Sequence, residues 1–186
     1  ASMFPAVGKV VPHVRSKVGA FCTQHHHKPE WGPLALDLLE QGHLPEVILG
    51  QLLKDDDKRD KRQLGIVDMQ GRTANRNPSN ADASGIWWGG VTGRYYACQG
   101  NSLAGGDVIS AMAMTFEDTW RQSLGERLIA ALCAGDQAGG DHRGRLAAGL
   151  RLTRPESDDD ALLSLDVDDS KTAVMDLANM FKSIFQ

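Results

Sequence analysis

Patterns typical of strands and of helices alternate along this chain, mostly in pairs, and that order restricts the folds open to it. Apolar runs at residues 8–14 and 18–24 predict a strand pair. Leucines at 34–39, closed by Gly42, and a run that opens at Pro45 predict two helices. The same criteria predict strands at 63–68 and 72–74, one or two strands at 85–98 with a turn near Gly89 and Gly90, helices that begin near Asp107 and Ser123, strands at 146–153 and 162–167, and a helix at 171–185.

The resulting order, ββααβββααββα, favours an α+β fold. Paired strands joined by short turns suit antiparallel ladders, and the helix pairs between them can cover the outer faces of two packed sheets. A chain of 186 residues is long enough to bury one core of this kind. We therefore predict a single domain that spans residues 1–186.

Local signals predict several details of these elements. Ser123 and Glu126 match a capping box, and Asp107 can cap the preceding helix. The mixed-charge run at residues 54–62 predicts a solvated loop, and the acidic run at 156–160 predicts the turn between the two late strands.

Composition excludes several classes of protein. Hydrophobic residues make up 41% of the chain and charged residues 24%, which are ordinary values for a globular domain. The net charge is −4, so we expect no nucleic-acid partner, and no apolar run approaches the roughly 20 residues of a membrane span. Cys22, Cys98 and Cys133 are odd in number and far apart, which predicts reduced, buried thiols and a cytoplasmic location. A reactive Cys98 is the alternative.

Two segments crowd polar side chains between glycines, beside apolar runs. They are QGNSLAG at residues 99–105 and GGDHRGR at 139–145. Glycine permits positive φ and close backbone approach, which sites need and plain loops rarely do.

Each segment supplies candidate site residues with a structural alternative. Gln99 and Asn101 are neutral donors of the kind an oxyanion hole uses, and they could equally satisfy backbone groups at a strand end. Asp141, Arg143 and Arg145 could hold a carboxylate or carbonyl of a substrate. The alternative for these three is a structural ion pair beside the following strand.

Several stretches of the chain match the sequence pattern of one known family. They are the opening ASMFPAVGKVVP at residues 1–12, residues 19–20, 23–24, 32–39 and 63–68, and both glycine-bounded segments. Together these stretches resemble a largely uncharacterised bacterial family of unknown function that is assigned to the Ntn-hydrolase superfamily. The resemblance covers most of the chain. It implies a four-layer αββα sandwich and hydrolysis of a C–N bond in a small-molecule amide, cyclic amide or ureido compound, without a cofactor.

In Ntn hydrolases the first residue of the mature chain, Thr, Ser or Cys, attacks the carbonyl and its own α-amino group acts as base. Ala1 has no nucleophile, whereas family members carry an opening β-hairpin of roughly 20 residues before this point. We therefore expect the functional protein to contain that hairpin, cleaved and still bound as a peptide or replaced by another strand. Its first residue would be the nucleophile, with Ser2, Gln24, Gln99, Asn101 and Asp141 around it. Removal of Ala1 would instead make Ser2 the nucleophile.

Two other functions stay open at this stage. On an extended chain His25 and His27 would face the same side, so a metal-dependent hydrolase is one alternative, with His13 or Asp68 as a further ligand. A solvated histidine loop is favoured over that site. The second alternative is a non-catalytic binding or scaffold domain.

Apolar side chains predict self-association. Trp87, Trp88 and the helix at 175–185 offer more apolar surface than one small domain easily buries. We expect a homodimer or larger homo-oligomer, with a small-molecule substrate as the other partner.

Overall fold

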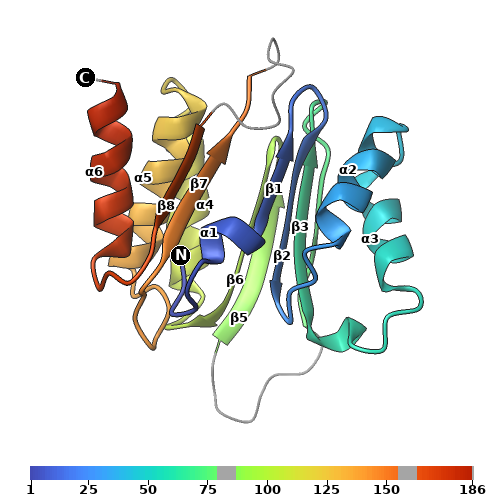
Figure 1. The fold of residues 1–186 in the computed structure, drawn as a ribbon, viewed down its shortest axis with the longest axis horizontal. Coiled ribbons are helices and arrows are strands. Elements are labelled where there is room, and N and C mark those ends of the chain that lie inside the picture. The colour runs from blue at the N-terminus through green and yellow to red at the C-terminus, as the bar shows by residue number, and fades with distance from the viewer. Residues whose placement is uncertain (79–86, 155–162, 186) are drawn as a thin grey trace.

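Antiparallel strands occupy the middle of the molecule and helices lie along its two sides (Figure 1). The computed structural model describes residues 1–78, 87–154 and 163–185. Every pairing between named strands in these residues is antiparallel, as expected for the predicted α+β class.

The first sheet is built from one continuous part of the chain. Its strand order is β1-β2-β3-β4, and its strands are β1 (Pro12–Arg15), β2 (Gly19–His25), β3 (Arg62–Asp68) and β4 (Thr73–Arg76). Helices α2 (Trp31–Glu40) and α3 (Pro45–Leu53) cover its outer face, and a short 3-10 helix, η1 (Arg59–Lys61), leads into β3.

The remaining strands form two separate ribbons. One pairs β5 (Trp87–Gly93) with β6 (Tyr96–Leu103), and the other pairs β7 (Ala148–Leu152) with β8 (Leu163–Val167). Helices α4 (Asp107–Asp118), α5 (Leu124–Gln137) and α6 (Ala173–Ile184) lie on the far side of these ribbons in Figure 1. Within the described residues, β6 and β7 do not pair with each other.

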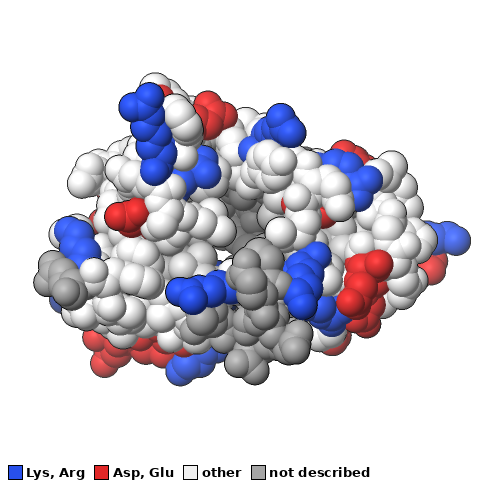
Figure 2. All heavy atoms as spheres, turned by 90° about the horizontal axis from the view of Figure 1, so that it is seen from above, with Lys and Arg blue, Asp and Glu red and all other residues white. Residues whose placement is uncertain are grey.

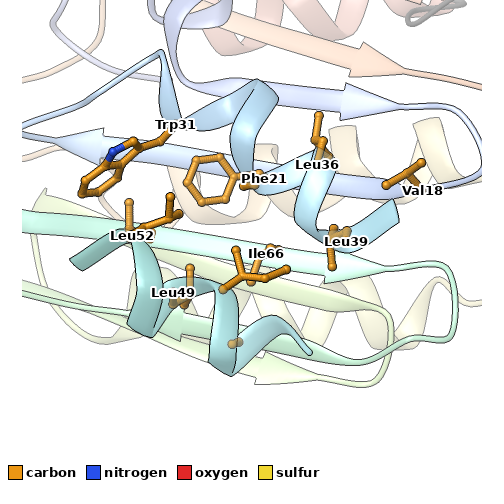
Figure 3. Packing of buried hydrophobic residues seen from close by; sticks show 12 residues of the cluster. Val18, Phe21, Trp31, Leu36, Leu39, Leu49, Leu52 and Ile66 are labelled. Carbon is orange, nitrogen blue, oxygen red and sulfur yellow. The ribbon is translucent and has the colours of Figure 1, made fainter. Parts of the chain in front are cut away.

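Two apolar clusters hold the layers together. The first packs α2 and α3 on the four-stranded sheet, and Figure 3 shows Phe21 and Ile66 of that sheet among the side chains of the two helices. The second packs α5 and α6 on β7 and β8, with Leu177 fully buried. β3 is buried along nearly its whole length because helices cover one face and the β5–β6 ribbon the other.

Glycines let the first sheet and the β5–β6 ribbon approach closely. A Cβ on Gly65 of β3 would lie 2.3 Å from Oε1 of Gln99 on β6. A Cβ on Gly90 of β5 would lie 2.8 Å from both Asn75 Nδ2 and Cys98 O. A larger residue at Gly90 would meet the backbone of β6, and one at Gly65 would displace the amide group of Gln99.

The structure corrects the first predicted strand. Residues 7–10 form a helical turn, α1 (Val7–Val10), and only Pro12–Arg15 is extended. Gly8 packs directly on β7, where its Cβ would come within 2.9 Å of Gly149 Cα, and the Ala6 N–H donates to Asp168 Oδ1. These distant contacts override the strand-like sequence.

Other local predictions fare differently. β5 continues through Gly89 and Gly90 with only a register shift between Trp87 and Gly89, and the turn falls at Tyr95, whose φ is +70°. Asp107 is the first residue of α4 rather than its cap. The capping box of Ser123 and Glu126 is confirmed, and the predicted turn at 156–160 lies outside the described residues.

The sequence suggested that the charged segment at 54–62 is a solvated loop, but part of this segment is buried. Arg62 donates through Nε to Asp56 Oδ2 at 2.7 Å, and the side chains are only 7% and 4% exposed. Arg62 also donates to the carbonyl oxygen of His26. The hydrogen bond that Asp56 accepts from Arg62 holds the pKa of the Asp56 carboxyl below its ordinary value. Arg62, at the start of β3, is therefore tied to the segment after α3 by a buried ion pair and to the segment after β2 by a hydrogen bond.

Charge on the surface is mixed. Figure 2 shows positive and negative side chains interspersed on the face seen from above, and that face is hollowed near its centre. In the described residues no helix is both long enough and apolar enough to span a bilayer.

We predict that Asp56→Ala lowers the free energy of unfolding by about 3–5 kcal/mol, because it leaves the buried Arg62 charge without its carboxylate partner. Urea denaturation at pH 7 measures this. The difference from wild type should shrink as the pH falls below the ordinary carboxyl pKa of 3.8, because the stabilisation by a carboxylate of depressed pKa is lost on protonation. Asp60→Ala is the matched control, since Asp60 is 61% exposed, and we expect a change within about 0.5 kcal/mol. Equal losses in both variants would contradict the assignment.

We also predict self-association from exposed apolar side chains in or next to helices α4 and α6. Met114 and Phe185 are each 62% exposed and Trp120 is 65% exposed, which is more than a single domain usually leaves in water. Light scattering at micromolar concentration should give at least twice the chain mass of 20.2 kDa. A mass near that of one chain would refute the prediction.

Candidate functional site

A cavity of about 430 Å³ lies where the end of β2, the end of β6 and the first residues of the chain meet. Its walls include nine of the site residues suggested by the sequence: Ser2, Gln24, His25, His27, Gln99, Asn101, Asp141, Arg143 and Arg145. The structure thus brings these residues together, although they come from four distant parts of the chain. Their roles stay predictions.

The two glycine-bounded segments meet at this cavity. Leu103 and Asp141 form an antiparallel bridge, in which the Ala104 N–H donates to Gly140 O and the His142 N–H donates to Ser102 O. Gly140 and Gly144 have φ values of +53° and +95°, so the turn uses backbone conformations that other residues rarely adopt. The glycines therefore shape the wall that carries Asp141.

The start of the chain forms another wall. Ser2 pairs with Ala147 just before β7, and the Ser2 N–H donates to Ala147 O at 2.8 Å. The Ser2 Oγ accepts from the Phe4 N–H at 3.0 Å. Burial lowers the pKa of an amino group at Ala1, although the charges of Cys22, Asp136 and Asp141 oppose that shift. Ala1 itself lies at the wall of the cavity and is exposed.

A buried amide, Gln63, orients two of the polar side chains. Its side chain is fully buried on β3. Gln63 Oε1 accepts from Gln24 Nε2 at 3.0 Å and from Asn101 Nδ2 at 2.9 Å. Its Nε2 donates to Gly100 O, Gly89 O and Asn77 Oδ1. Gln63 therefore links the first sheet to the β5–β6 ribbon and leaves Gln24 and Asn101 one N–H each.

Gln99 lies against β3 with an unmet hydrogen-bonding group. Its Oε1 is buried and has no partner among the described residues, and neither does the nearby Asn75 Nδ2. A buried acceptor without a donor destabilises the fold. The stability of the fold alone therefore does not explain why a glutamine occupies position Gln99.

Two ion pairs neutralise the charged wall. Arg143 donates through Nε and Nη2 to the two carboxylate oxygens of Asp141, at 2.9 and 2.7 Å. Arg145 Nη2 donates to Asp136 Oδ2 at 2.7 Å. The first pair raises the pKa of Arg143 above its ordinary value, and the hydrogen bond that Arg143 donates to Asp141 is the largest cause. The structural alternative foreseen for these residues is thus present in the fold.

The histidines lie at the rim without forming a metal cluster. β2 ends at His25, whose φ is +63°, so the chain is not extended through His27 as the same-side argument assumed. The possible further ligands lie elsewhere: His13 packs over Gly32 and Asp68 pairs with Arg72. The described residues contain no group of three or more His, Cys, Asp or Glu side chains placed to hold a metal ion.

Cys98 does not line this cavity, and its sulfur lies 3.9 Å from the Met112 sulfur. Burial raises its pKa to about 12, so little thiolate exists near neutral pH. Burial likewise raises the pKa of Cys22 to about 11. Both thiols therefore behave as packing groups.

Sequence reasoning missed Gln63 and Asp136 as members of this site. Gln63 opens an apolar strand and looked like its first residue, although its register partner across the ladder is Gln24. Asp136 lies near the end of α5, where an acidic residue opposes the helix dipole and so signals a specific partner.

Comparisons with known proteins give a family and a fold. A model described as "Family of unknown function (DUF1028)" matches residues 1–177. A crystal structure of a protein from Silicibacter pomeroyi, described by its title as matching the same family model, is similar over all of this chain and 81% of its own, with 24% identity and a TM-score of 0.87. No curated protein matches significantly.

We predict opposite effects on stability for two amides of the site. Gln63→Met should lower the free energy of unfolding by about 2–4 kcal/mol, because Gly100 O and two amide N–H groups lose a buried partner. Gln99→Met has the same change of shape, but it removes an unmet acceptor, so we expect no loss or a gain of up to about 1 kcal/mol. Urea denaturation of both variants decides the matter. A larger loss for Gln99→Met would mean that Gln99 is structural.

Proposed function

This chain belongs to the DUF1028 family, a family of unknown function, and we propose that it hydrolyses a C–N bond of a small molecule in the cavity described above. The observation that supports this proposal is that amide side chains from two facing layers line the cavity beside the start of the chain. These side chains are Gln24, Gln99 and Asn101. Neutral N–H donors are the groups that stabilise the oxyanion of a tetrahedral intermediate. A cavity of about 430 Å³ also suits a small ligand.

The proposal assigns the four-layer αββα sandwich of Ntn hydrolases to this chain. The order of helices and sheets across Figure 1 supports that assignment. The split between the two ribbons supports an additional hairpin, because β6 and β7 each present an edge that no described strand pairs.

The register at Ser2 gives such a hairpin its direction. Because Ser2 lies antiparallel to Ala147, residues that precede Ala1 in a longer gene product would continue along β7, between it and β6. The two strands of a hairpin run in opposite directions, so its first and last residues lie at the same end. Its first residue would therefore return to the cavity beside Ala1. That residue is the proposed nucleophile.

The chemistry then follows in two steps. The hydroxyl or thiol of that first residue attacks the amide carbonyl, and the α-amino group takes its proton and passes it to the departing amine. Asn101, held by Gln63, donates its second N–H to the oxyanion. Water then hydrolyses the acyl-enzyme and restores the nucleophile.

We predict that the protein made from the whole gene begins with Thr, Ser or Cys and hydrolyses at least one member of an amide, cyclic amide and ureido library. Intact-mass analysis with N-terminal sequencing identifies the first residue. Its replacement by Ala should lower turnover at least about a thousandfold, and Asn101→Leu should lower kcat about a hundredfold or more. Ser2→Ala should retain activity.

Each other outcome selects an alternative. If the active form begins at Ser2 and Ser2→Ala abolishes turnover, Ser2 is the nucleophile. If a protein with a free Thr, Ser or Cys at its start hydrolyses nothing in the library, the binding or scaffold function replaces hydrolysis. Turnover that a chelator removes would indicate the metal-dependent reaction.

A further inference from the structure

The charged side chains of the cavity are already neutralised in pairs, and this limits the ligands it accepts. Among its described lining residues the acidic and guanidinium groups are Asp136, Asp141, Arg143 and Arg145. They form one bidentate pair and one single hydrogen-bonded pair, both at 2.7 Å at the closest. The Asp141 and Asp136 side chains are 8% and 12% exposed, so both carboxylates are desolvated, whereas the Arg143 and Arg145 side chains are 47% and 33% exposed.

A ligand carboxylate would have to displace one of these aspartates or lie unpaired beside it. Either alternative leaves an anion desolvated without its own cation, which is unfavourable. A neutral carbonyl meets no such penalty, because each guanidinium has further N–H groups that can donate without a change of charge.

The uncharged groups of the cavity complement an amide edge. Gln24 and Asn101 each give one N–H to Gln63 and keep a second N–H; Gln24 also keeps its carbonyl oxygen, whereas Asn101 Oδ1 accepts from Ser102 Oγ at 3.4 Å. A cyclic amide or ureide presents a donor and an acceptor side by side, which matches such a group with two hydrogen bonds. Across the cavity, Val108, Ile109 and Met112 of α4 form an apolar wall.

We infer that this cavity binds small uncharged cyclic amides or ureides that carry an apolar substituent, and that the Asp136–Arg145 and Asp141–Arg143 pairs exclude carboxylate ligands. The inference rests on the proposed function for the choice of the amide class. It adds the charge selection and the residues that set it.

Three probes with the same apolar group separate charge from ring shape. They are 5-isopropylhydantoin, which is neutral and cyclic, N-carbamoylvalinamide, which is neutral and open, and N-carbamoylvaline, which is open and anionic. Calorimetric titration of the full chain at pH 8 keeps ordinary histidines neutral. We expect the hydantoin to bind best and the anion at least about tenfold more weakly than either neutral probe. The affinity of the neutral probes should not change between about 0.05 and 0.5 M NaCl.

Substitution of one aspartate should change this preference. Asp136→Asn frees the Arg145 charge, so the affinity for N-carbamoylvaline should rise about fivefold to tenfold and should become sensitive to salt. Glu40→Gln is the matched control, because it removes one negative charge from an exposed side chain that pairs with Arg15, on α2. Arg145→Gln removes a positive charge instead, so the affinity for N-carbamoylvaline should fall below that of wild type.

The outcomes are decisive in both directions. Tighter binding of the anion by wild type, an unchanged preference in both cavity variants, or no binding of any probe overturns the inference. Because binding is measured separately from turnover, a preference for neutral probes without hydrolysis by the whole gene product would refute the proposed function and leave the charge selection standing.

Discussion

A single side-chain amide joins the two facing layers of this protein at the point where the cavity forms. Gln63 accepts hydrogen bonds from Gln24 of its own sheet and Asn101 of the opposite ribbon, and it donates to backbone carbonyls of that ribbon. Apolar packing fixes the distance between layers but not their register, whereas hydrogen bonds are directional. The polar groups of the cavity therefore depend on the same contact that aligns the sheets.

The sequence predicted most helices and strands because their apolar periodicity is strong and local. The errors fell where distant contacts decide. Val7–Val10 is helical because Gly8 packs on Gly149, and Gly89 and Gly90 serve close packing rather than a turn. The Asp56–Arg62 pair was hidden for the same reason, since burial of a charged run depends on its partner and not on its composition.

Prediction of the site succeeded unevenly for a related reason. Glycine-bounded polar segments are recognisable locally, so Gln99, Asn101 and Asp141 were named as candidates. Gln63 and Asp136 act through partners far away in the chain, and neither lies in a recognisable motif. The pairing of Arg143 and Arg145 with carboxylates depends on side-chain geometry, which residue type alone leaves undetermined. Because each arginine is paired with an aspartate, two residues that looked suited to bind an anion carry no net charge as pairs.

The chain order of the two sheets has a consequence for folding. All strands of the first sheet and both of its helices lie within residues 12–76, so that half can form through contacts between neighbours in sequence. The cavity cannot form in this way, because its walls also include Ser2, the end of β6 and residues 140–145. It exists only when the second half is docked on the first. A ligand that fills the cavity would contact both halves and would therefore stabilise their docking.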